Sequence, residues 1–117
     1  MREGLVGIDI DAKGDVVVAR VTGELDIAGA SRTGDRIAGS VPTSAAGLVV
    51  DFSDLEFIDS SGIAMLFGLA RRLDSRRQRL RVVATPGGPV SRVLDIVEFE
   101  RAAPVHSQPE TAIADLE

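Results

Sequence analysis

The chain has no cysteine, tryptophan or tyrosine, and its 117 residues include a single histidine, His106. Without cysteine there can be no disulfide framework, thiolate nucleophile or cysteine-ligated zinc site. A Ser–His pair or a histidine metal site would depend on His106 alone, which we expect to be a surface residue beside the last helix. Aromatic residues make up only 3%, so the core must be built mainly from Val, Leu, Ile and Ala. We therefore predict no metal site and no bound cofactor.

Long apolar runs are also missing. Residues Met1 to Leu5 lack the apolar run of a secretory signal peptide, and no stretch approaches the roughly 18 apolar residues of a membrane span. The length fits one domain over residues 1–117, with one sizeable core. We expect a soluble protein of the cytoplasm that makes no contact with a membrane.

Positive charge is scarce overall, because the formal net charge is −5, which argues against a general nucleic-acid binder. Six of the thirteen basic residues are nevertheless arginines between Arg71 and Arg81. This cluster is either a basic patch for RNA or an acidic partner, or a solvated helix end whose cations lie near the helix C-terminus. We favour the helix end, because no aromatic residue interleaves the arginines. No direct nucleic-acid partner is expected.

Hydrophobic periodicity predicts strands that alternate with helices. The expected elements are a hairpin over 8–11 and 16–21, a helix over 30–41, a strand over 47–52, a helix from 60, a strand over 79–84, a helix from 89, a short strand over 102–105, and a last helix opened by a capping box at Ser107 and Glu110. Such alternation implies parallel neighbours in one sheet, and the hairpin makes the sheet mixed. We predict a single α/β domain with a mixed sheet of four or five strands and about four helices, in which Val49 and Val50 are central.

The segment from Leu48 to Ile63 is the most informative. An apolar strand ends near Asp51, a short connection follows, and Asp59 and Ser60 open a helix with a predicted apolar stripe; its members are Ile63, Leu66, Phe67, Ala70 and Leu73. We predict that Ser60 is the N-cap of this helix, and that Gly62 leaves the site unshielded. On residue chemistry alone a simple helix cap is favoured. A phosphate on Ser60 would, however, be held at the positive end of the helix dipole.

Two motifs together resemble the anti-sigma factor antagonists, bacterial members of the STAS domain family. They are Asp59-Ser60-Ser61-Gly62, which follows a buried strand and an Asp, and Gly23-Glu24-Leu25-Asp26, about 35 residues earlier. The element order matches this family over nearly all of residues 1–117, as one STAS domain. The resemblance implies that Gly23 to Asp26 form a turn between the second strand and the first helix.

The same resemblance implies a non-enzymatic switch. Ser60, and less so Ser61, corresponds to the serine phosphorylated by a partner that is both an anti-sigma factor and a serine kinase. The unphosphorylated protein binds that partner and frees the sigma factor for transcription, and a protein phosphatase reverses the modification. Asp26, Asp59, Ser61 and Gly62 are the expected contacts to the kinase, and Asp26 could also cap the first helix. Four acids are candidates for the contact edge: Asp26, Asp54, Glu56 and Asp59.

Two other functions are open. A STAS subunit could act as a scaffold in a stress-signalling complex or a lipid-transport complex. A nucleotide-binding or hydrolytic enzyme is less favoured, because the chain has no Gly-x-x-x-x-Gly-Lys loop. Asp51, Asp54 and Asp59 are also spaced like caps and turns rather than metal ligands.

Overall fold

The computed structural model describes residues 6–117, so the apparent lack of a signal peptide at Met1 to Leu5 concerns residues outside this range. Within it, the strands are β1 (Gly7–Lys13), β2 (Val16–Leu25), β3 (Gly47–Asp51), β4 (Leu55–Ile58), β5 (Arg79–Val83) and β6 (Val105–His106). The helices are α1 (Ala30–Gly39), α2 (Ser60–Ser75), α3 (Pro89–Ile96) and α4 (Pro109–Leu116), with a 3-10 turn, η1 (Phe99–Arg101), before β6. The predicted order of strands and helices is confirmed, except that β4 is additional.

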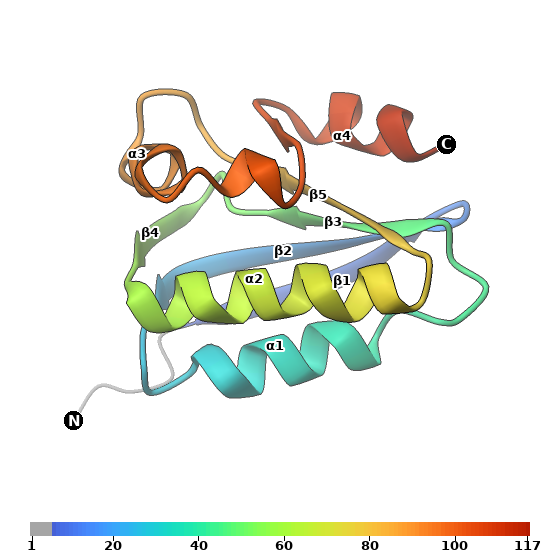
Figure 1. The fold of residues 1–117 in the computed structure, drawn as a ribbon, viewed down its shortest axis with the longest axis horizontal. Helices are drawn as coiled ribbons and strands as arrows, with labels where there is room; N and C mark the ends of the chain where they lie inside the picture. The colour runs from blue at the N-terminus through green and yellow to red at the C-terminus, as the bar shows by residue number, and fades with distance from the viewer. Residues whose placement is uncertain (1–5) are drawn as a thin grey trace.

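All six strands belong to one mixed sheet, ordered β1-β2-β3-β5-β6, with β4 paired to β2 beyond the end of β3 (Figure 1). Only β1 runs antiparallel to its neighbour; β3, β4, β5 and β6 pair in parallel. This confirms the predicted α/β class and mixed sheet, with β4 as a strand that the sequence did not predict.

Strand β2 is longer than predicted, because it continues past Val21 to Leu25. Its first half pairs with β3 and its last residues pair with β4, with a register shift between Gly23 and Glu24. Gly23 has a φ of 87°, which few other residues adopt, and this irregularity interrupts the alternation that marks a strand. The predicted turn at Gly23 to Asp26 is therefore mostly strand.

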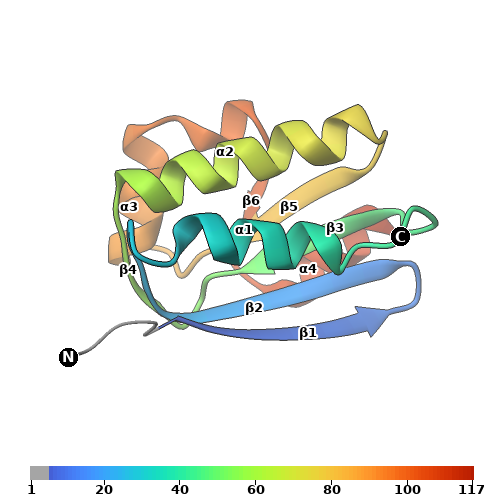
Figure 2. The same ribbon diagram turned by 90° about the horizontal axis from the view of Figure 1, so that it is seen from below.

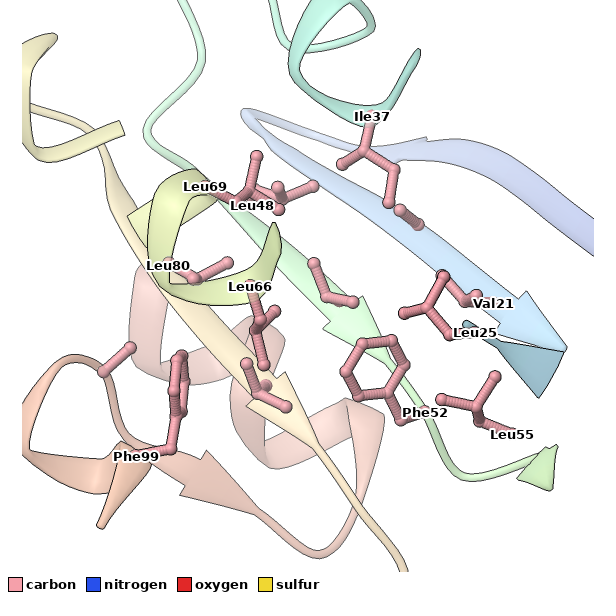
Figure 3. Close-up of a cluster of buried hydrophobic side chains, with 14 of the residues drawn as sticks. Val21, Leu25, Ile37, Leu48, Phe52, Leu55, Leu66, Leu69, Leu80 and Phe99 are labelled. Atoms are coloured by element: carbon pink, nitrogen blue, oxygen red, sulfur yellow. The ribbon is translucent and has the colours of Figure 1, made fainter. Parts of the chain in front are cut away.

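The main core lies between the sheet and helices α1 and α2, which cover the same face (Figure 2; Figure 3). Alternate residues of β2, among them Val17, Ala19 and Val21, belong to this core. The predicted stripe on α2 is confirmed at Ile63, Leu66 and Leu73, which are buried. Phe67 and Ala70 are only partly buried, and Leu69 is buried as well.

The opposite face of the sheet carries a smaller cluster under α4. Val16, Val49 and Val83 of three adjacent parallel strands pack there with Ala112 and Leu116 of the helix. None of the helices within residues 6–117 is both long and apolar enough to cross a bilayer.

Three further predicted boundaries are wrong. The first helix ends at Gly39 rather than 41, because the C-cap Ser40 donates its hydroxyl hydrogen to the Ile37 carbonyl at 2.6 Å. The last strand begins at Val105, since the chain first makes η1 and a turn. The expected capping box is also absent: Pro109 is the first residue of α4, so Gln108 and not Ser107 is its N-cap, without a side-chain cap bond.

Candidate functional site

The two sequence motifs meet at one edge of the sheet, where β2 and β4 end side by side. Leu25 is the parallel partner of Ile58, so Asp26 and Asp59 follow immediately at the carboxyl ends of two paired strands. The backbone N–H of Asp59 donates to the Leu25 carbonyl at 3.2 Å. Parallel strand ends are common places for functional side chains, and here the pairing brings together segments distant in sequence.

Asp59, and not Ser60, is the N-cap of α2. Its backbone is extended, and its Oδ1 accepts from the N–H groups of Ser61 at 2.9 Å and Gly62 at 3.1 Å. Both residue types make good caps, but Asp59 ends β4 and is held in extended form by the bond to Leu25. Ser60 thus becomes the first helical residue. It is exposed, and its hydroxyl makes no hydrogen bond with any described residue.

Gly62 is buried, whereas Ser60, two residues earlier, is exposed. A Cβ at this position would lie 2.6 Å from Cγ1 of Ile58 and 3.0 Å from the Leu25 carbonyl oxygen. Glycine is therefore required because the first turn of α2 packs directly against the ends of β2 and β4. This contact fixes the start of the helix, and with it the position of Ser60.

Ser61 has different surroundings from Ser60. It is partly buried, and it lines a groove of about 450 Å³ between α1 and α2, together with Ile27, Gly34 and Arg72. The two neighbouring serines therefore differ in exposure: Ser60 is exposed on the surface, whereas Ser61 is partly buried and lines the groove.

Asp26 organises the turn before α1 but does not cap that helix, so its predicted role as an N-cap is wrong. Its Oδ1 accepts from the Ala28 N–H at 3.0 Å, and its carbonyl accepts from Gly29 and Ala30 at 3.1 and 2.9 Å. The N-cap of α1 is Gly29, because the aspartate turn places the helix start three residues later.

Two exposed apolar side chains accompany the acids at this edge. Ile27, which directly follows Asp26, is 82% exposed, and Phe57, which pairs with Glu24 across the strands, is 47% exposed. Their exposure is not predicted from the sequence, because apolar residues near strands are expected in the core. Glu56 is exposed beside Phe57, whereas the charge of Asp54 is compensated by an ion pair with Arg20.

A family model described as "Mlab, STAS domain" matches residues 8–105, which is most of the chain. The chain belongs to the STAS domain family. Its fold is similar to that of an anti-sigma factor antagonist from Mycobacterium paratuberculosis, with a TM-score of 0.84 and 23% identity over 95% of this chain and 93% of that one.

Two solved forms of SpoIIAA are also similar to this STAS domain. The phosphorylated form, a Bacillus cell fate determinant, has a TM-score of 0.71 and 22% identity, over 95% of this chain and all (100%) of that one. The unphosphorylated form, an anti-sigma factor antagonist, has a TM-score of 0.69 and 22% identity, over 93% of this chain and 96% of that one. At these identities the likeness shows a shared fold.

The arginine cluster of this STAS domain lies at the far end of α2 and on β5. Arg72 pairs with Asp35 at 3.1 Å and Arg81 with Asp115 at 2.6 Å, while Arg76 and Arg79 donate to backbone carbonyls. The helix-end interpretation therefore accounts for only part of the cluster. Its other members lie on a strand or are held by partners on α1 and α4.

His106 lies beside the last helix, as predicted, but its side chain is only 21% exposed. Its Nε2 is 3.3 Å from Asp115 and its Nδ1 3.2 Å from the Thr111 hydroxyl. The hydrogen bond from Arg81 holds the pKa of Asp115 below its ordinary value of 3.8. Within residues 6–117, no three His, Cys, Asp or Glu side chains are grouped so that they could hold a metal ion.

Proposed function

We propose that this STAS domain is an anti-sigma factor antagonist, a binding module rather than an enzyme, that acts in the cytoplasm through Ser60. With Ser60 unmodified, it binds an anti-sigma factor that is also a serine kinase, and the sigma factor is released. Phosphorylation of Ser60 by this partner separates the two proteins, and a protein phosphatase restores binding. The observation that carries the proposal is an exposed hydroxyl, free of hydrogen bonds to described residues, fixed at the first position of α2.

The helix start can carry a phosphate without loss of the fold. A phosphoserine adds a charge of about −1.5 to −2, and the N-terminal end of a helix favours negative charge. Ser60 is also exposed, so the added group remains solvated in the free protein. Since Asp59 already accepts from the N–H groups of Ser61 and Gly62, the phosphate would add to an existing negative charge.

The surroundings of Ser60 suit a protein partner. Ile27 and Phe57 offer exposed apolar surface at this edge, and Asp26, Asp59 and Glu56 give it negative charge. A partner with apolar side chains and a basic rim would complement this edge. A phosphate in the contact must then lose its water. A hundredfold loss of affinity requires only about 2.7 kcal/mol, which such desolvation can supply.

The test combines calorimetry with the cognate anti-sigma kinase and mass spectrometry of the phosphorylated product. Ser60→Asp should retain the fold and bind at least tenfold more weakly. Ser60→Ala should bind like the parent and resist phosphorylation. Ser61→Ala is the matched control, and it should remain a kinase substrate because Ser61 lies in the groove.

Each failure has a distinct meaning. Phosphate on Ser61 would show that the modified residue is the neighbour. Tight binding by Ser60→Asp would show that desolvation of an added charge is not the mechanism. A scaffold subunit of a stress-signalling or lipid-transport complex would bind its partner whatever the charge at Ser60, so an unchanged affinity would favour that alternative.

A further inference from the structure

A second charged surface lies at the other end of α2, and it has the opposite sign. Four arginines there have no acidic partner within residues 6–117: Arg71, Arg76, Arg77 and Arg79. Helix geometry places this end roughly 22 Å from Ser60. Cations near a helix C-terminus are favourable, which accounts for the arginines on α2. It does not account for Arg79, which lies on β5.

The neighbouring edge of β5 is only partly covered. Strand β6 pairs with Val82 and Val83 alone, through bonds from Val82 N–H to Pro104 and from Ala84 N–H to His106. Because N–H groups alternate along a strand, the N–H of Leu80 points to the same side, where no strand of residues 6–117 pairs with it. The Leu80 carbonyl on this edge accepts from the guanidinium of Arg81 at 2.9 Å.

A cavity of about 350 Å³ adjoins this open edge. Phe67 and Ala70 of α2 and Ala102 give it apolar walls, while Arg71 and Arg79 bring two guanidinium groups without acidic partners. Asp74 is the one acid in its lining, and Arg81 is already bonded to Asp115. The cavity thus combines a free backbone donor, apolar walls and an excess of positive charge.

We propose that the edge of β5 over Arg79–Arg81 is a docking site for an extended acidic segment of a partner protein. Such a segment would add as a short strand, accept a hydrogen bond from the Leu80 N–H, and place carboxylates on Arg71 and Arg79. The positive charge of Arg71 and Arg79 favours an acidic occupant. A second copy of the same edge would bring guanidinium groups against guanidinium groups. The site does not depend on the role proposed for Ser60.

The test is a fluorescence anisotropy titration with a labelled Val-Glu-Val-Glu-Val peptide. Saturable binding is expected, and the matching glutamine peptide should bind at least tenfold more weakly. Replacing both Arg71 and Arg79 with Glu should weaken binding of the acidic peptide at least tenfold. The double variant Arg36→Glu, Arg92→Glu is the matched control. It changes net charge equally, at exposed arginines outside the cavity, and should bind like the parent.

Hydrogen exchange adds a structural readout, because the Leu80 amide should exchange more slowly when the acidic peptide is bound. No saturation up to about 1 mM peptide would overturn the proposal, as would equal weakening in both double variants. Binding without protection of the Leu80 amide would exclude strand addition. Displacement of the peptide by duplex DNA with a steep salt dependence would assign the surface to nucleic acid instead. Ser60→Asp should leave peptide binding unchanged, which separates this site from the proposed switch.

Discussion

The two ends of α2 differ in how the chain holds them. At the start, the Asp59 cap, its bond to Leu25 and the close approach of Gly62 fix the first turn. At the end, Arg77 takes the left-handed conformation, with a φ of 60°, where helices usually have glycine. The Arg77 and Gln78 N–H groups close the helix by donating to Asp74 and Leu73, both at 2.9 Å.

At both ends of α2, the residue type is explained by side-chain space or charge and not by the preference of the backbone conformation. Gly62 is present because no side chain fits between α2 and Ile58. At Arg77 glycine would suit the backbone better, yet the chain has an arginine, with a backbone cost on the order of 1 kcal/mol. The positive charge at this end is thus present despite the local backbone preference, consistent with the proposed acidic partner.

The largest expected change in stability comes from the buried middle of α2, which lies between its two ends. Leu66 lies in the middle of α2 and is fully buried, so Leu66→Ala should lower the free energy of unfolding by about 2–5 kcal/mol. Denaturant melts measure this change. Exposed Arg71→Ala on the same helix is the control, with an expected change within about 0.5 kcal/mol. A comparable effect of the two substitutions would contradict the burial assigned to Leu66.

Alanine at two glycines of α2 should have opposite effects. Gly62→Ala forces a Cβ against Ile58 and should destabilise by about 1–3 kcal/mol. At Gly68 a Cβ would meet only the Arg71 guanidinium, at 3.8 Å, so Gly68→Ala should stabilise by up to about 1 kcal/mol. Thermal and denaturant unfolding of both variants give the sign. If both substitutions destabilise equally, the close approach at Gly62 is not the cause.

Because Asp59 is the N-cap of α2, substitutions at Asp59 and Ser60 should differ in their effect on stability. Asp59→Ala should destabilise by about 1 kcal/mol, because two N–H groups lose their acceptor. Ser60→Ala should change stability by less than about 0.5 kcal/mol, as an exposed residue outside the cap. Equilibrium unfolding of the two variants decides between the residues, and a larger loss at Ser60 would restore it as the cap.

At the opposite end, Arg77→Gly should stabilise the protein by up to about 1 kcal/mol, since glycine adopts a positive φ without strain. The gain is reduced by the greater freedom of glycine in the unfolded chain. Arg76→Gly, at a position with negative φ, is the matched control and should not stabilise. Chemical denaturation of both variants tests the strain; a loss as large at Arg77 as at Arg76 would show that Arg77 is unstrained.

The smallest expected effect concerns the ion pair between Arg81 and Asp115. Because the folded-state pKa of Asp115 lies below its ordinary 3.8, the pair stabilises above that pH and its contribution is lost as pH falls through the folded pKa. Asp115→Asn should therefore lower stability slightly at neutral pH, and converge with the parent once the pH falls below the folded-state pKa of Asp115. Denaturation midpoints across this range measure it. A difference that persists in acid would indicate a packing effect instead.

The fold class, the element order and the buried stripe of α2 could be predicted, because periodicity depends on nearby residues. Strand β4 could not: its two middle residues, Glu56 and Phe57, are both exposed, so it shows no alternation. The predicted cap is wrong by one position, since Asp59 and Ser60 have similar capping preference and only the pairing with β2 distinguishes them.

The surface around the predicted site residues could not be predicted from the sequence. The exposure of Ile27 and Phe57 depends on which elements pack nearby, and no local pattern reports this. The pairing of Arg72 and Arg81 was equally hidden, because Asp35 and Asp115 lie 37 and 34 residues away in the chain. Long-range contacts of this kind determine which arginines remain available.

Helix α4 should have low local stability. Within residues 6–117, this eight-residue helix without a side-chain cap bond provides the cluster that covers Val16, Val49 and Val83. So short a helix depends on its packing, and it can detach by local unfolding at less cost than global unfolding. Its amides should exchange early and its backbone be cut first by proteases. Each detachment bares an apolar strip on three parallel strands, so self-association should begin from this face.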